Sequence, residues 1–427
     1  MTESFEHKGI FWLPSKPTEQ IHGILKYAPE DGVRLDLIGA FPRQQDKFDL
    51  ILGFTETGKC VTLYNSFETQ RGFNLPGMDT SKIFSNFALI GSEHLDTLPK
   101  LKFQKATIYL KHLDEWVNRR EGFQIDENWK EKEVTIKYKL PKSIETNVGS
   151  KFKLTISPTA KGPCWNIVQK EAKITQRINC IFSYSRKKSF DDILEDISHF
   201  EQFLTLCSQR PTHPIEYYLL NKDEKGKFTK RFDVYHQITV DKTIKKDLTP
   251  FDFLVQFKPI EPSFDTIINK WYSSQIVLET CYIPFFNNYY GRQLYTSDKF
   301  LNMCRALEAF HRDTVGVTDP ATGREYHYKK RVIEVFDSVS SCFNFLLKIR
   351  DKNKFADKIK NYRNDFTHSN PILLDRNKKY LETHYLTEKL TIIMSCAILH
   401  YLGLTKKEIK QRMTDTSLYT HIKYKMK

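Results

Sequence analysis

The spacing of apolar residues changes along the chain, and this change most constrains the fold. Short apolar or alternating runs predict strands in the first half of the 427 residues, for example at 33–39, 60–64 and 152–156. Beyond Gly291 the apolar residues recur every three or four positions, which predicts helices. The sequence therefore predicts an α+β protein, in which a β-rich domain like an antiparallel sandwich or barrel precedes an all-α bundle.

The predicted domains cover 1–285, with room for two subdomains, and 291–427. The segment 284–295 marks the boundary because it carries Asn-Asn and Gly, which favour turns. One amphipathic helix is expected inside the first domain, at 189–207. The helices expected in the second domain cover 297–313, 328–350 (with a break near 338–341), 353–366, 378–402 and a short segment that begins with a capping box at Thr405 and Glu408.

The third of these helices ends in an Arg-Asn-Asp-Phe-Thr-His segment, in which Arg363 precedes His368 by five positions. Arg and His with four to six residues between them occur twice more in the chain, at Arg305/His311 and Arg231/His236, so the spacing alone is weak evidence. The pair at Arg231 belongs to an alternating strand pattern, and the pair at Arg305 lies within a helical pattern. Arg363/His368 alone stands at a helix end.

The segment Ser-Asn-Pro follows His368, and the residue before a proline is disfavoured in the α conformation. This predicts an accessible imidazole at the end of the helix. A histidine can take the 2′-OH proton of RNA or donate a proton to the leaving 5′-oxygen. The planar, permanently charged guanidinium of Arg363 matches the charge that develops on the phosphate oxygens. On an unbroken helix, however, the two side chains point about 140° apart.

The charge of the chain favours a polyanionic partner. The formal net charge is +14, and residues 291–427 contain 26 Lys and Arg against 15 Asp and Glu, a net charge of +11. A basic domain most often binds nucleic acid, although solvated basic helix faces would give the same excess.

Several classes of protein are disfavoured. The eight cysteines show no Cys-x-x-Cys and no zinc spacing, so we expect reduced core cysteines, no metal and no cofactor. The longest apolar stretch, 390–404, is too short to span a bilayer, and the N-terminus lacks a signal-peptide pattern. We expect a cytoplasmic protein without a membrane partner.

The helical third resembles the HEPN superfamily, whose ribonucleases carry Arg, four to six residues and His, often with Asn after the Arg. Arg363, Asn364 and His368 match this pattern. The segment Cys-Arg-Ala-Leu-Glu-Ala-Phe-His at 304–311 is similar to the first helix of the ApeA-type HEPN branch, and the segments at 9–14, 21–25 and 61–63 resemble that branch's N-terminal domain. The resemblance implies bacterial anti-phage defence by abortive infection through RNA cleavage, a homodimer and a phage-encoded trigger or inhibitor.

The resemblance also implies roles for individual residues. Arg363 and His368 would be catalytic, in a composite cleft formed by two copies of the chain, and would leave a 2′,3′-cyclic phosphate and a 5′-OH. The supporting residues would be Asn364, Asp365, Glu308 and His311, although for the last two the sequence favours a solvated helix flank over a place in the cleft. The candidate RNA-phosphate contacts are Lys354, Lys358 and Lys360, for which a solvated face is an equal alternative.

Three hypotheses follow, and the last of them, a β-sandwich protein that binds a ligand or glycan and whose helices only dimerise, is disfavoured because the excess charge lies on the helical part. The first is a metal-independent endoribonuclease toxin whose RNA substrate, tRNA among the candidates, the sequence does not name. The second is a catalytically silent HEPN module that binds RNA or protein, joined to a β-rich ligand-sensing domain. In the second case Arg363 and His368 would be structural.

Overall fold

The computed structural model describes residues 3–42, 46–73, 75–166, 171–238, 248–291, 294–368 and 376–419. The chain forms two compact units. Unit 1 comprises 1–201 and 212–245, and unit 2 comprises 202–211 and 246–427. Unit 1 holds the large sheet and unit 2 is helical, so the predicted α+β class with its β-rich N-terminal part is confirmed.

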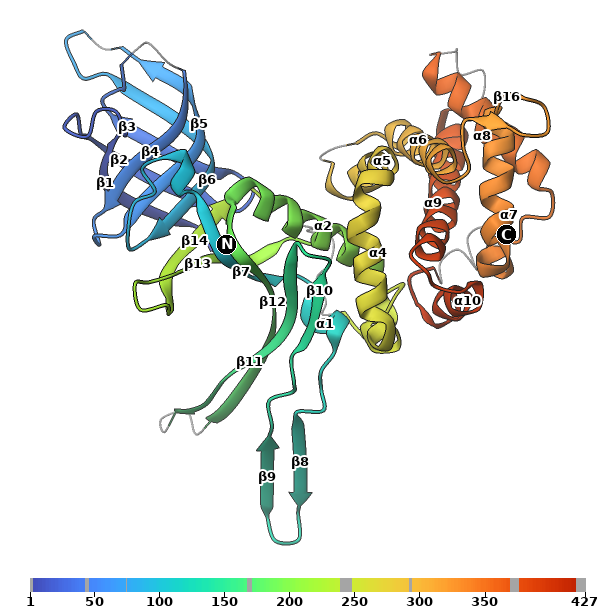
Figure 1. Ribbon diagram of the computed structural model, residues 1–427, viewed down its shortest axis with the longest axis horizontal. Coiled ribbons are helices and arrows are strands. Elements are labelled where there is room, and N and C mark those ends of the chain that lie inside the picture. Colours follow the sequence, from blue (N-terminus) through green and yellow to red (C-terminus); the bar gives the residue numbers. More distant parts are fainter. Residues whose placement is uncertain are drawn as a thin grey trace. The chain divides into compact units, whose positions relative to one another are not determined.

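Unit 1 begins with a closed, six-stranded antiparallel barrel (Figure 1). Its strands follow the order β6-β3-β2-β1-β4-β5, and pairing between β5 and β6 closes it. The strands are β1 (Phe5–Trp12), β2 (Ile21–Ala28), β3 (Gly32–Ile38), β4 (Lys47–Thr55), β5 (Cys60–Gly72) and β6 (Thr80–Gly91). The alternation that predicts strands at 33–39 and 60–64 thus becomes the inside and outside of a barrel.

The barrel is filled by side chains from the inward positions of its strands. Val33, Leu35 and Leu37 alternate along β3 and are buried, while Arg34 between them is exposed. Because neighbouring residues of a strand point to opposite faces, this two-residue period places every second side chain in the core. The barrel is therefore a packed core and not an open channel.

Strand β6 continues the barrel into the rest of the sheet. Its first half, Thr80–Ser85, pairs with β3, and its second half, Phe87–Gly91, pairs with β14. From there the sheet runs β14-β13-β7-β12-β11-β10. These strands are β7 (Lys102–Leu110), β10 (Ile144–Val148), β11 (Phe152–Asn166), β12 (Glu171–Ser189), β13 (Pro214–Lys222) and β14 (Phe228–His236).

A separate two-stranded hairpin, β8 (Phe123–Asn128) and β9 (Glu133–Tyr138), pairs only with itself among the described strands and projects from unit 1 in Figure 1. The short helices of this region are η1 (Leu98–Lys100) and α1 (Leu113–Val117). The predicted amphipathic helix is α2 (Phe190–Ser208), which the division between the units crosses. Ser189 Oγ accepts a hydrogen bond from the amide of Asp192 at 3.3 Å, as expected of a capping serine.

Unit 2 contains the helices η2 (Pro250–Asp252), α3 (Phe257–Ile260), η3 (Glu261–Ser263), α4 (Phe264–Val277), α5 (Glu279–Tyr290), α6 (Thr296–Thr314), α7 (Tyr328–Leu347), α8 (Lys352–Thr367), α9 (Arg376–Tyr401) and α10 (Lys406–Asp415). Between α6 and α7 a small hairpin forms from β15 (Thr318–Asp319) and β16 (Arg324–Glu325). The capping box predicted at Thr405 and Glu408 is present at the start of α10.

Two features of this region differ from the local expectation. The segment expected to separate the domains is helical as far as Tyr290, because α5 accommodates Pro284 in its interior, and residues 246–285 fall in unit 2. α7 is also unbroken from Tyr328 to Leu347. The serines at 338, 340 and 341 suggested a break, but Ser338 Oγ donates to the Val335 carbonyl oxygen at 2.7 Å and is accommodated within the helix.

Candidate functional site

Helix α8 carries the Arg363/His368 pair, and both of its ends are well defined. Asp351 caps the N-terminus by accepting hydrogen bonds from the amides of Asn353 and Lys354, both at 3.0 Å. Phe355, Ala356, Ile359 and Tyr362 form its buried face. Their spacing of three and four residues fixes which way α8 faces, and therefore where Arg363 and His368 point.

Arg363 is held against two other helices of unit 2. Its Nη2 donates to Glu308 Oε2 on α6 at 3.0 Å, and its guanidinium lies 4.4 Å from the ring centroid of Tyr328, the first residue of α7. The side chains of Arg363 and Glu308 are each about one-third exposed. The structure thus brings together Arg363 and Glu308, two residues that the sequence analysis grouped. Tyr328 belongs beside them, and no sequence motif indicated it.

His368 lies at the C-cap of α8 and is exposed. Its amide donates to the carbonyl oxygen of Asn364 at 2.9 Å, so the helix is continuous from Arg363 to the cap. Five helical positions correspond to about 7.5 Å along the axis and about 140° around it. The helix does not end between the two residues, and within one chain Arg363 turns toward α6 and α7.

Asn364 lies one turn before His368, and Lys360 one turn before Asn364. Side chains four apart on a helix share a face, so these three residues form a row that ends at the imidazole. Lys360 is exposed and Asn364 is half-buried. Lys358 pairs with Glu382 of α9 at 3.0 Å, and the Nζ of Lys354 lies 4.0 Å from Asp351. Of the three candidate lysines, Lys360 is the nearest to His368 along the helix, at about 12 Å along the axis.

Asp365 faces α9. It accepts a hydrogen bond from the ammonium of Lys379 at 2.9 Å, and the Lys379 side chain is only 7% exposed. The hydroxyl of Tyr362 donates to Glu382, which holds the pKa of that carboxyl below its usual range. These pairs tie the last turn of α8 to α9, and no local sequence signal marks them because the partners lie 14 and 20 residues apart.

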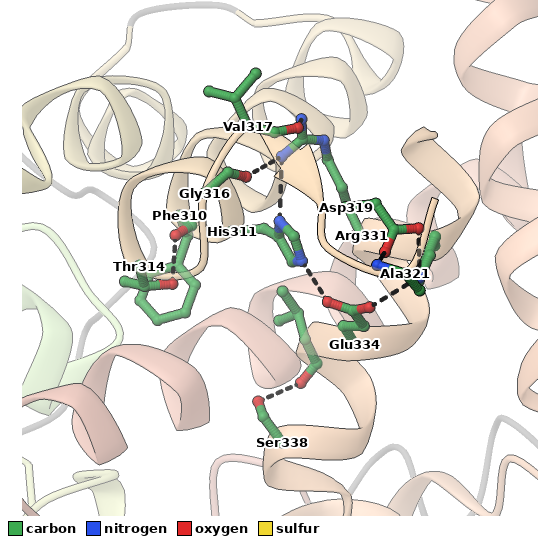
Figure 2. A network of polar contacts seen from close by, with 12 residues as sticks. Phe310, His311, Thr314, Gly316, Val317, Asp319, Ala321, Arg331, Glu334 and Ser338 are labelled. Carbon is green, nitrogen blue, oxygen red and sulfur yellow. Dashed lines mark hydrogen bonds and ion pairs between the residues drawn. The ribbon is translucent and has the colours of Figure 1, made fainter. Parts of the chain in front are cut away.

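His311 does not share a recorded contact with Arg363. It is fully buried and lies between Arg331 and Glu334 of α7 (Figure 2). Its Nε2 is 2.8 Å from Glu334 Oε2, and Arg331 Nη1 is 3.1 Å from its Nδ1. Because the guanidinium can only donate, Nδ1 accepts and Nε2–H donates to Glu334. Burial lowers the pKa of His311, which favours this neutral form.

The same network holds the segment between α6 and α7. Arg331 also donates to the carbonyl oxygens of Gly316 and Val317, at 3.2 and 3.4 Å, and Lys330 pairs with Asp319 at 2.5 Å (Figure 2). His311 thus belongs to a buried network that fixes the β15–β16 hairpin to α7. This places it apart from the exposed end of α8.

Other features bear on the chemistry available. Seven cysteines, at positions 60, 180, 207, 281, 304, 342 and 396, are buried free thiols, and burial raises the pKa of Cys304 to about 12. Within the described ranges, no three His, Cys, Asp or Glu side chains gather as ligands for a metal ion. None of the helices in those ranges is both long and apolar enough to cross a membrane.

Two family models match the chain. Residues 6–271 match the ApeA N-terminal domain 1, and residues 301–408 match the Apea-like HEPN domain. No curated protein and no solved structure gives a significant match. The first match covers the barrel, the rest of the sheet and part of α4, and the second spans the helices that carry Glu308, Arg363 and His368. The resemblance stated from the sequence is confirmed, and the chain belongs to the family of ApeA-like HEPN proteins.

Proposed function

We propose that the chain is a metal-independent endoribonuclease of bacterial anti-phage defence, with Arg363 and His368 as its catalytic residues. The observation that carries this proposal is the end of α8, where an exposed imidazole follows a positioned guanidinium within five residues. HEPN domains are generally ribonucleases, and members of the ApeA branch act in anti-phage defence. The fold and the residue chemistry therefore support the same activity.

His368 has the position that a proton-transfer group needs. It is exposed, it caps the helix, and no described residue covers it. A neutral imidazole can take the proton of the 2′-OH as this oxygen attacks the adjacent phosphate, and an imidazolium can protonate the departing 5′-oxygen. The bond formed is 2′-O–P and the bond broken is P–O5′, so the products are a 2′,3′-cyclic phosphate and a 5′-OH.

Arg363 supplies positive charge for the phosphate oxygens. Glu308 accepts one hydrogen bond from the guanidinium, which has five N–H donors, so others remain for an anion. The ring of Tyr328 lies against the guanidinium and limits its rotation. Glu308 and Tyr328 are positioning residues in this proposal, because they act on the substrate only through Arg363. A guanidinium already held in place stabilises the transition state without the cost of ordering it.

Two copies of the chain would complete the site. Within one chain the two side chains are about 140° apart on a continuous helix, so a single α8 does not place both on the same phosphate. In a two-fold dimer, the end of one α8 would face the end of the other, and Arg363 of one copy could meet His368 of the next. We infer that cleavage requires the dimer.

The test is cleavage of total cellular RNA in EDTA by the full chain, by Arg363→Ala and by His368→Ala. Of these three proteins we expect only the unmodified chain to cleave, with cyclic-phosphate and 5′-OH ends. Arg305→Ala and His384→Ala are matched controls, since both residues are exposed on helices of the same unit. Equal cleavage by all five proteins would overturn the assignment of Arg363 and His368.

One observation favours the second function, a silent HEPN module that binds RNA or protein. Arg363 already has two partners within its own chain, as a purely structural arginine would. In that case Arg363→Ala lowers the thermal stability of unit 2, and neither Arg363→Ala nor His368→Ala changes RNA cleavage. RNA binding by the unmodified chain without product formation, both alone and in phage-infected cells, would establish this second function.

A further inference from the structure

A pocket of about 290 Å³ lies beside the end of α8 in unit 2. It forms where the start of α6, the last turn of α8 and the start of α9 meet. Small-molecule sites usually span about 300–1,000 Å³, so this pocket suits one small ring system rather than a larger ligand.

Aromatic rings form much of the pocket lining. Phe366 comes from α8, Tyr295 precedes α6, and Tyr380 belongs to α9. Tyr295 is 78% exposed and Tyr380 is 63% exposed. Exposed aromatic side chains are the usual platform on which bases of single-stranded RNA stack, because every base presents an apolar face.

The pocket also offers polar groups for the edge of a base. The ammonium of Lys379 has three donors, and Asp365 is the one acceptor recorded for it among the described residues. The hydroxyl of Thr383, a residue that is 1% exposed in the pocket wall, donates to the Lys379 carbonyl oxygen at 2.7 Å, and the hydroxyl oxygen keeps a lone pair that can accept. A donor and an acceptor thus lie at the same pocket as the aromatic rings, and bases carry both groups on their edges.

The pocket is close to the proposed chemistry. Phe366 is two residues before His368, so their Cα atoms lie at most about 7 Å apart. Lys379 links the pocket to the helix of the motif through Asp365, two residues after Arg363. Two positions on a helix differ by about 200° in direction, so Phe366 and the imidazole of His368 face different sides of α8, and a base in the pocket would belong to a nucleotide a short distance along the strand from the phosphate that His368 reaches.

We propose that this pocket binds one unpaired base of the RNA substrate, stacked on the exposed rings of Tyr380 and Tyr295 and hydrogen-bonded by Lys379 and Thr383. This inference rests on the proposed function of the Arg363/His368 site, and it adds a specificity site to it. The pocket selects single-stranded RNA, since a base within a duplex is not free to enter. It also sets the position of the cleaved bond relative to the bound base.

Binding tests the pocket without cleavage. The protein is the full chain with His368→Ala, and the probes are a fluorescent single-stranded oligoribonucleotide and an abasic oligomer of the same length. When Tyr380→Ala is added to this chain, the affinity for the first probe should fall about tenfold, which is the contribution expected of one stacked base. The affinity for the abasic probe should not change. Tyr380→Phe, which keeps the ring, should bind as tightly as the unmodified pocket. Phe345→Ala, which removes an exposed ring from α7, is the matched control.

Three results of this binding experiment and its controls would overturn the proposal. The first is equal affinity for the two probes, or failure to bind either, by the chain with an intact pocket. The second is an equal loss in Tyr380→Phe and Tyr380→Ala, which would show that stacking is not the cause. The third is a change from dimer to monomer in Tyr380→Ala, which would assign this surface to a second copy of the chain. Thermal unfolding of each variant confirms that it is folded.

A cleavage assay distinguishes failure of the pocket proposal from failure of the proposed nuclease. With His368 intact, Tyr380→Ala should alter which sequence positions are cut while the products keep cyclic-phosphate ends. Cleavage by the unmodified chain without any base preference would overturn the pocket and leave the proposed nuclease standing. Base-dependent binding without cleavage would instead support the pocket and contradict the nuclease.

Discussion

The guanidinium of Arg363 donates to the carboxylate of Glu308 at 3.0 Å, which connects the last turns of α8 to α6. Both side chains are about one-third exposed, so the pair is accessible to solvent and to an anion. The contact holds Arg363 near the C-terminal end of α8. The one carboxylate in the last turn of that helix, Asp365, pairs with Lys379 and not with Arg363. Much of what we predict for activity depends on this geometry.

Arg363→Lys should lower the rate of RNA cleavage by about 100-fold or more. A lysine keeps the charge but loses the planar fork that can bind Glu308 and a phosphate together. The free energy of unfolding should change by less than about 1 kcal/mol, because the ion pair is partly exposed. Single-turnover cleavage and urea denaturation of the same preparation measure both quantities. A lysine variant with full activity would show that only the charge matters.

Glu308→Gln should reduce cleavage far less than Arg363→Lys. The amide oxygen of glutamine can still accept from the guanidinium, so the arginine stays oriented while the carboxylate charge is removed. Glu308→Ala, which removes the acceptor, should be the more damaging change. Comparing kcat and KM for the two variants tests this order. An increase in KM with an unchanged kcat in both variants would indicate that Glu308 acts on substrate binding rather than on the position of Arg363.

A mixture of Arg363→Ala and His368→Ala chains should recover activity that neither has alone. If each site combines Arg363 of one copy with His368 of the other, a mixed dimer keeps one intact site. Random exchange of subunits then gives about one quarter of the unmodified activity. Cleavage by the mixture after co-refolding measures this. Sites formed within a single chain would give no recovery, which makes the outcome decisive for the dimer.

Acidification should destabilise unit 1 through His236. Burial lowers the pKa of this imidazole to about 4, whereas the pKa in an unfolded chain is about 6.5. The unfolded state binds the proton first as the pH falls, so the free energy of unfolding decreases between pH 6.5 and pH 4, by up to about 3 kcal/mol. Urea midpoints of the unmodified chain and His236→Gln across this range test the effect. A pH dependence that is identical in both proteins would exclude His236 as its source.

Arg331→Met should destabilise unit 2 by about 3 kcal/mol or more. The guanidinium is 2% exposed, and its loss leaves His311 Nδ1 and the carbonyl oxygens of Gly316 and Val317 without their donor. Hydrogen exchange of the amides around the β15–β16 hairpin should increase most, because the network holds that segment. Lys329→Met, which removes a half-exposed partner of Asp357 from the same helix, is the control and should cost little.

Local sequence patterns determined most of the elements. The two-residue period of Val33, Leu35 and Leu37 is enough for a strand with one buried face, and the three- and four-residue spacing along α8 is enough for an amphipathic helix. The Thr405/Glu408 capping box and the Ser189 cap also follow from adjacent residues alone. These features depend on interactions within a few positions of the chain, which is why they could be predicted.

The division between the units was decided by packing. Asn287, Asn288 and Gly291 favour turns locally, yet α5 continues to Tyr290 because Cys281, Tyr282, Phe285 and Phe286 become buried. The closure of the barrel likewise depends on β5 meeting β6, a pairing that neither strand's own sequence specifies. Burial of apolar surface outweighs local propensity in both cases.

The sequence by itself determined that Arg363 and an accessible His368 stand at the end of one helix, since the spacing and the following Asn-Pro act locally. Only the tertiary structure decided which residues surround them. Glu308 contacts Arg363, while His311, three positions further along α6, is buried against Arg331 and Glu334. The physical reason is that residues three apart on a helix differ by about 60° in direction, and the helices that pack around α6 decide which direction meets the motif and which meets the core.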